Sequence, residues 1–154
     1  MSAPKTDLST LLERVRGASE GDRELDADLA RFVLGLNVWE EPVMDFHTGR
    51  SERTTPVMSA THDGSETHRF FDGIPEWTSG LDAALALCER VLPGWSWAVF
   101  SRSYDRGLYL GGPAAAVTRP VSSVLFENMT RAKTPALALC AVILSAKIAE
   151  QENP

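Results

Sequence analysis

The sequence lacks the features that mark secreted and membrane-spanning proteins. Its two cysteines, Cys88 and Cys140, are too few for a disulfide framework. No apolar run approaches the ~20 residues that a membrane span needs, and the first residues carry no apolar signal segment. These absences predict a protein of a reducing cytoplasm, without a membrane segment.

Catalytic and metal-binding fingerprints are also missing. The chain has no Gly-x-Ser-x-Gly motif, no Walker loop and no Rossmann fingerprint. Both cysteines fall in apolar helical stretches, where a thiol is inert. His62 and His68 are six residues apart in a polar loop, which is no zinc spacing, and His47 lies further away. We therefore expect no catalytic residue, no metal site and no cofactor.

A basic surface is the third absence, since the net charge of the 154 residues is −6. Residues 1–77 hold 15 acidic and 8 basic side chains, a net charge of −7. Residues 78–154 hold 6 acidic and 7 basic side chains, a net charge of +1. Attraction to nucleic acid or to an anionic membrane is not expected from this balance.

What the chain does contain is a repeated pentapeptide, Ala-Leu-Ala-Leu-Cys, at Ala84–Cys88 and at Ala136–Cys140. Each copy follows a helix-start signal. Ser79 reads as the N-cap of the first helix, in a capping box with Asp82. Thr134 precedes a proline at the first position of the second. The predicted helices cover residues 80–92 and 135–149.

The rest of the chain divides into helices, an irregular stretch and strands. Apolar spacing predicts helices over residues 7–17 and 23–34, the second capped by Asp22. Prolines and glycines interrupt the middle of the chain. Short strands are expected there at Val43–Phe46 and His68–Phe71, with a polar loop from Thr48 to Thr67. Three further strands are predicted at Trp95–Ser101, Leu108–Leu110 and Ala115–Arg119.

These elements predict one α+β domain over residues 1–154. It consists of N-terminal helices (7–35), an irregular insert (38–77) and a core of the order helix–strand–strand–strand–helix (78–150). Short loops favour antiparallel pairing. We expect an α-β-α sandwich around a small, mainly antiparallel sheet of three to five strands, with the N-terminal helices on one side and the two pentapeptide helices on the other.

Several stretches resemble one family, the phage ABA sandwich domain proteins. These are Leu11–Val15 with Asp22–Asp26, Thr78–Leu87 with Val91–Trp95, and Thr134–Ala141. The resemblance implies an α-β-α fold in an accessory protein encoded by a phage or prophage, acting in the cytoplasm of the bacterial host. It supplies no catalytic residue, and it does not extend to residues 38–76.

The tryptophans and arginines of the insert are the candidate ligand-binding residues. Four tryptophans are many for this length. Trp39 and Trp77 flank the insert, and they either anchor its ends or form a stacking wall for a planar ligand. An arginine beside such a wall can hold a phosphate or a nucleotide. The candidate set is Trp39, Arg50, Arg53, Arg69 and Trp77.

A nucleic-acid-binding module is the alternative. The order helix–three strands–helix is also that of double-stranded RNA-binding domains, which carry basic residues before their last helix. The acidic net charge argues against this reading. Its candidate residues are Arg102, Arg106, Arg119, Arg131 and Lys133.

Two functions follow as hypotheses. The first is a non-catalytic accessory protein that binds a small ligand or a host protein, one concrete form being counter-defence by sequestration of a nucleotide signal. The second is the nucleic-acid-binding module. The apolar helix faces exceed what one small sheet needs, so a homodimer is also considered.

Overall fold

The computed structural model describes residues 3–35, 37–44, 51–61, 66–69, 74–105, 108–120 and 128–152. Within them are the helices α1 (Ala3–Gly17), α2 (Arg23–Phe32), α3 (Leu81–Val91) and α4 (Pro135–Glu152). The strands are β1 (Asn37–Met44), β2 (Ser51–Thr61), β3 (Glu66–Arg69), β4 (Ser96–Phe100), β5 (Ser103–Asp105), β6 (Leu108–Gly111), β7 (Ala114–Thr118) and β8 (Asn128–Arg131).

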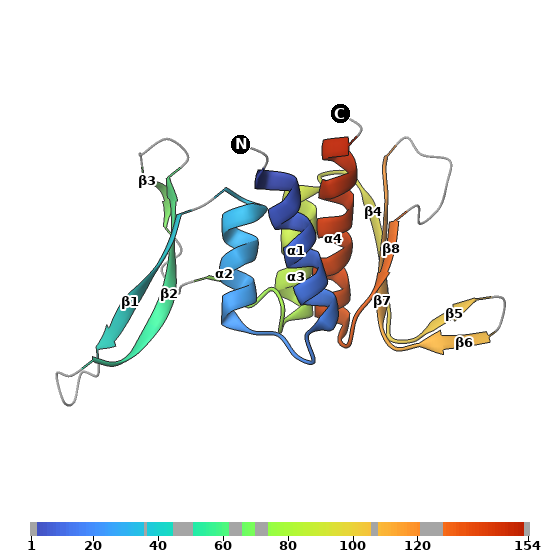
Figure 1. Ribbon diagram of the computed structural model, residues 1–154, viewed down its shortest axis with the longest axis horizontal. Coiled ribbons are helices and arrows are strands. Elements are labelled where there is room, and N and C mark those ends of the chain that lie inside the picture. Colours follow the sequence, from blue (N-terminus) through green and yellow to red (C-terminus); the bar gives the residue numbers. More distant parts are fainter. Residues whose placement is uncertain are drawn as a thin grey trace.

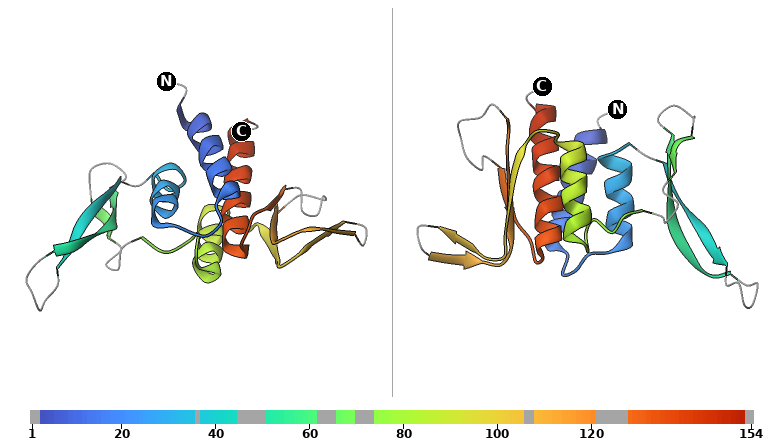
Figure 2. Two further views of the ribbon diagram at one scale, coloured as in Figure 1. Left: turned by 60° about the horizontal axis from the view of Figure 1, so that its bottom comes forward. Right: turned by 180° about the vertical axis from the view of Figure 1, so that it is seen from behind.

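The helices form a middle layer between two groups of strands (Figures 1 and 2). The α+β class is confirmed, as is the order helix–strands–helix of the C-terminal half. The layers themselves are stacked as β, α and β, whereas the sequence suggested α, β and α. The difference arises because α1 packs on α4 and not on a sheet.

Helix α4 is the central element of the helical layer. All nine residues from Ala136 to Leu144 are buried, because α1 and α3 pack on it from two sides and β4, β7 and β8 from another. A helix that is apolar around its whole circumference must be buried by other elements on every side.

Strand β7 is the centre of the three-stranded sheet that covers α4. It pairs antiparallel with β4 and with β8, and Ala115 and Val117 belong to the core beneath α4. The predicted strands Trp95–Ser101 and Ala115–Arg119 correspond to β4 and β7. The predicted strand Leu108–Leu110 is present as β6, but it pairs with β5 in a separate hairpin.

The described part of the predicted irregular insert (38–77) contains regular structure, because β1, β2 and β3 form an antiparallel sheet there. Strand β2 occupies most of the predicted polar loop. Pro56 had been taken as an interruption. It lies opposite Glu40 of β1, in a part of β2 that has no described partner on its other side. A missing N–H is tolerated at such a position.

Two of the three predicted helix caps are present. The Asp22 side chain accepts from the Leu25 amide at 2.9 Å, and Thr134 Oγ1 accepts from the Leu137 amide at 3.1 Å. The predicted cap at Ser79 is wrong, since Gly80 is the N-cap of α3 and no side chain bonds there. Thr78, the residue before Ser79, points into the interior of the protein.

Thr78 joins the segment before α3 to a buried carboxylate on α2. Asp26 is fully buried and accepts from the Thr78 backbone amide and from Thr78 Oγ1, both at 2.8 Å. Arg23 adds an ion pair to Asp26 at 2.9 Å and donates to the Ile74 carbonyl. A buried charge needs such partners. We call this set of contacts the Asp26 latch.

The substitution Thr78→Val tests the latch. It removes the hydroxyl that donates to Asp26 and accepts from the Asp22 amide at 3.0 Å. We expect the free energy of unfolding to fall by about 1–3 kcal/mol, because buried polar groups lose a partner. Urea denaturation followed by tryptophan fluorescence measures it. Ser79→Ala is the matched control and should change stability by less than about 0.5 kcal/mol; equal losses would contradict the latch.

The latch also makes stability depend on pH. Burial raises the pKa of the Asp26 carboxyl above its ordinary value, against the opposing hydrogen bonds of Thr78 and Arg23. The folded chain therefore keeps this proton to a higher pH than the unfolded chain does. The contribution of Asp26 to stability is full below the ordinary pKa of about 3.9 and is lost as the pH rises through the raised value.

Comparison with Asp26→Asn isolates this effect. The free energy of unfolding of the wild type minus that of this variant should fall as the pH rises from the ordinary pKa of an aspartate to the raised pKa of Asp26. Urea titrations at a series of pH values measure the difference. A difference that grew with pH would show that folding lowers the pKa of Asp26.

Candidate functional site

A groove of about 570 Å³ lies between α1 and β8, over α4. Figure 1 shows α1 and β8 on the two sides of α4. The described residues that line the groove are Arg16, Met129, Thr130, Arg131 and Ser145. They come from three elements that are far apart in the sequence.

Helix α1 supplies Arg16 from its last turn. Leu11 and Val15 of the same helix are buried in the core, which fixes the backbone that carries Arg16. Its guanidinium lies 3.5 Å from Glu13, and the two side chains are 51% and 74% exposed. An ion pair this exposed is weak, so Arg16 can turn to an incoming anion at little cost.

Strand β8 supplies the opposite wall. Thr130 Oγ1 lies 3.3 Å from Ser145 Oγ on α4, so Thr130 faces the helical layer. Alternation along the strand places Met129 and Arg131 on the other face, and Met129 is 53% exposed. Three consecutive residues of β8 line the groove, while β7 occupies one edge of this strand. The groove therefore runs along the other edge.

The described residues that line the groove carry positive charge. They include two arginines and no carboxylate. A guanidinium with neighbouring hydroxyls is suited to binding phosphate or carboxylate oxygens. The sequence pointed to Arg131 as a basic residue but missed Arg16, Thr130 and Ser145. No local signal distinguishes these three, because only the packing of α1 and β8 on α4 brings them together.

The predicted ligand-binding residues of the insert are partly brought together. The register of the β1–β3 sheet pairs Trp39 with Val57, Val43 with Arg53, and Ser59 with Arg69. Trp39, Arg53 and Arg69 therefore lie on β1, β2 and β3 of one sheet. Arg50 lies outside the described residues.

Trp77, the fifth residue of that set, is buried with 3% of its surface exposed. Its backbone carbonyl accepts a hydrogen bond from the Cys140 thiol at 3.4 Å. Trp77 thus belongs to the core between the latch and α4. An anchor for the end of the insert, one of its two predicted roles, agrees with this burial.

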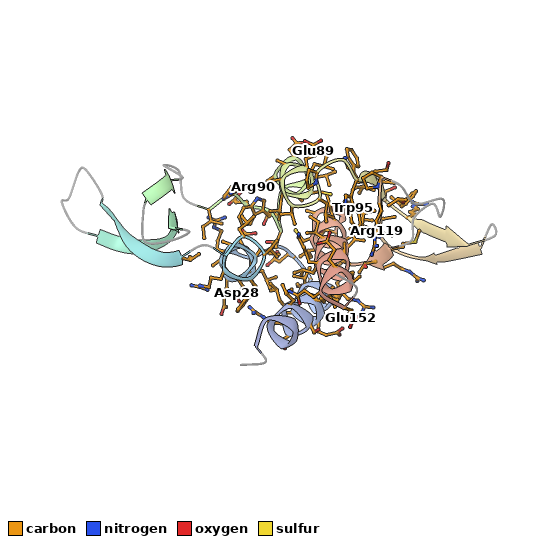
Figure 3. The ribbon with its side chains drawn as sticks, turned by 90° about the horizontal axis from the view of Figure 1, so that it is seen from above. Asp28, Glu89, Arg90, Trp95, Arg119 and Glu152 are labelled. Atoms are coloured by element: carbon orange, nitrogen blue, oxygen red, sulfur yellow. The ribbon has the colours of Figure 1, made fainter. Side chains whose placement is uncertain are left out.

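The residues of the nucleic-acid alternative lie in different settings. Arg119 stands over the ring of Trp95 at 5.9 Å, and Figure 3 shows the two side chains together. Arg131 lines the groove. Arg102 and Lys133 are exposed, and Arg106 lies outside the described residues. A shared nucleic-acid surface for these five residues stays a prediction.

Comparisons with protein-family models, curated proteins and solved structures gave no match to the chain. In the part of the chain that the structure describes, no group of three or more histidine, cysteine or acidic side chains could hold a metal ion. No helix among those residues is long and apolar enough to cross a membrane.

Both thiols are buried, as the sequence predicted. Burial raises the pKa of the Cys88 thiol to about 11, with a smaller effect from Glu89. Burial also raises the pKa of the Cys140 thiol. At neutral pH both groups are therefore protonated, and a protonated thiol is a poor nucleophile.

A thiol titration tests this. With a disulfide reagent such as DTNB at pH 8, the folded protein should react at least 100-fold more slowly than a free thiol, since only transient opening exposes the sulfurs. In 6 M guanidinium chloride both cysteines should react at once. Rapid reaction of either thiol in the folded protein would contradict the burial.

Proposed function

We propose that this chain is a non-catalytic binding protein that captures a small phosphate-bearing ligand, such as a nucleotide, in the groove between α1 and β8. One observation carries the proposal: Arg16 and Arg131 line the same groove as the hydroxyls of Thr130 and Ser145, with no carboxylate among its described lining residues. Guanidinium and hydroxyl donors bind phosphate oxygens directly.

The surroundings of the groove support this proposal. Met129 supplies an exposed apolar surface for the uncharged part of a ligand. The walls are carried by a helix and a strand that are packed on α4, so little ordering is needed on binding. The resemblance to phage proteins suggests the setting: an accessory protein in the host cytoplasm that sequesters a nucleotide signal of the host defence.

Thermal shift measurements test the proposal, with tryptophan fluorescence as the readout. The panel consists of pyrophosphate, AMP, ATP and cyclic dinucleotides. A ligand at 100 times its Kd stabilises the folded state by about 2.7 kcal/mol, so the Tm should rise by about 5–10 °C. Arg16→Ala and Arg131→Ala should each reduce the affinity at least tenfold.

Arg102→Ala is the matched control, because Arg102 is an exposed arginine that does not line the groove. It should leave the shift unchanged. A panel without any shift, or a shift that all three variants retain, would refute capture in the groove. Salt-dependent binding of duplex RNA that required Arg102 and Lys133 would instead favour the nucleic-acid alternative.

A further inference from the structure

The groove runs along an edge of β8 that no other described strand occupies. Among the described strands, β8 pairs with β7 alone, at the end of the order β4-β7-β8. Alternate residues of an antiparallel edge strand direct their N–H and C=O groups away from the sheet. On β8 these groups face the groove, so the groove offers main-chain hydrogen bonds as well as positive charge.

We propose that an extended acidic segment of a partner protein binds in this groove as a fourth strand beside β8. The inference shares Arg16 and Arg131 with the proposed function, but it concerns a different ligand and is tested separately. Main-chain pairing provides the affinity of such added strands, and alternate side chains provide the specificity.

Charge selects the partner. Arg16 approaches the groove from α1, on the side of the sheet that Thr130 faces, while Arg131 projects from the other face of β8. An added strand directs successive side chains alternately to these two sides. In an alternating valine-glutamate segment the glutamates therefore all lie either on the side of Arg16 or on the side of Arg131, and each of the two registers (phases) brings them near an arginine. The valines then lie on the opposite side, where Met129 is an apolar neighbour if that side is the one Arg131 projects from.

The same charges argue against a second copy of this chain as the occupant. Pairing β8 with the β8 of another copy would gather Arg16 and Arg131 of both copies at one edge, where like charges repel. The opposite edge of the sheet, β4, is Ser96–Phe100 and has no charged residue. It therefore lacks the charge complementarity that β8 offers.

A fluorescein-labelled octapeptide of alternating valine and glutamate is the probe, measured by fluorescence anisotropy with the full chain. A further peptide carries N-methyl groups on two adjacent central amides. Either phase directs one of these two methyl groups at β8, so this peptide should bind at least tenfold more weakly than the unmethylated one.

Matched protein variants complete the test. Arg16→Glu should weaken binding of the unmethylated peptide at least tenfold, and Arg102→Glu less than twofold. Strand addition is refuted if the octapeptide does not bind, if the methylated peptide binds as well as the unmethylated one, or if Arg16→Glu has no effect. Nucleotide binding without peptide binding would leave the proposed function standing, and the reverse result would refute that function alone.

Discussion

The structure depends on the need to cover α4 from every side. Its sequence is apolar around the whole circumference from Ala136 to Leu144, and a helix of this kind is stable only in an interior. Two helices and a sheet provide that interior. The layer order follows from this: α1 is needed on α4, so it cannot lie on the outer face of the β4-β7-β8 sheet.

The Asp26 latch is the polar counterpart of this apolar centre. A carboxylate without water must be satisfied by protein groups, and Thr78 and Arg23 satisfy it. The latch joins α2 to the segment that follows the β1–β3 sheet.

The groove lies where the unbroken run of buried residues on α4 is first interrupted. Ser145 is the first residue after Leu144 that is not fully buried, and its hydroxyl meets Thr130 of the edge strand. Arg16 of α1 and Arg131 of β8 line the same groove. The proposed binding groove thus arises from the geometry of packing, without any motif that a sequence search would detect.

The sequence by itself determined what depends on neighbours along the chain: the caps at Asp22 and Thr134, the helices, strands β4 and β7, and the burial of both cysteines. Only the tertiary structure decided the layer order, the pairing of β2 across Pro56, the inward turn of Thr78 and the presence of Arg16 and Arg131 on one groove. The reason is physical. Caps and periodicity are set within a few residues, whereas layers and grooves depend on which distant surfaces bury one another.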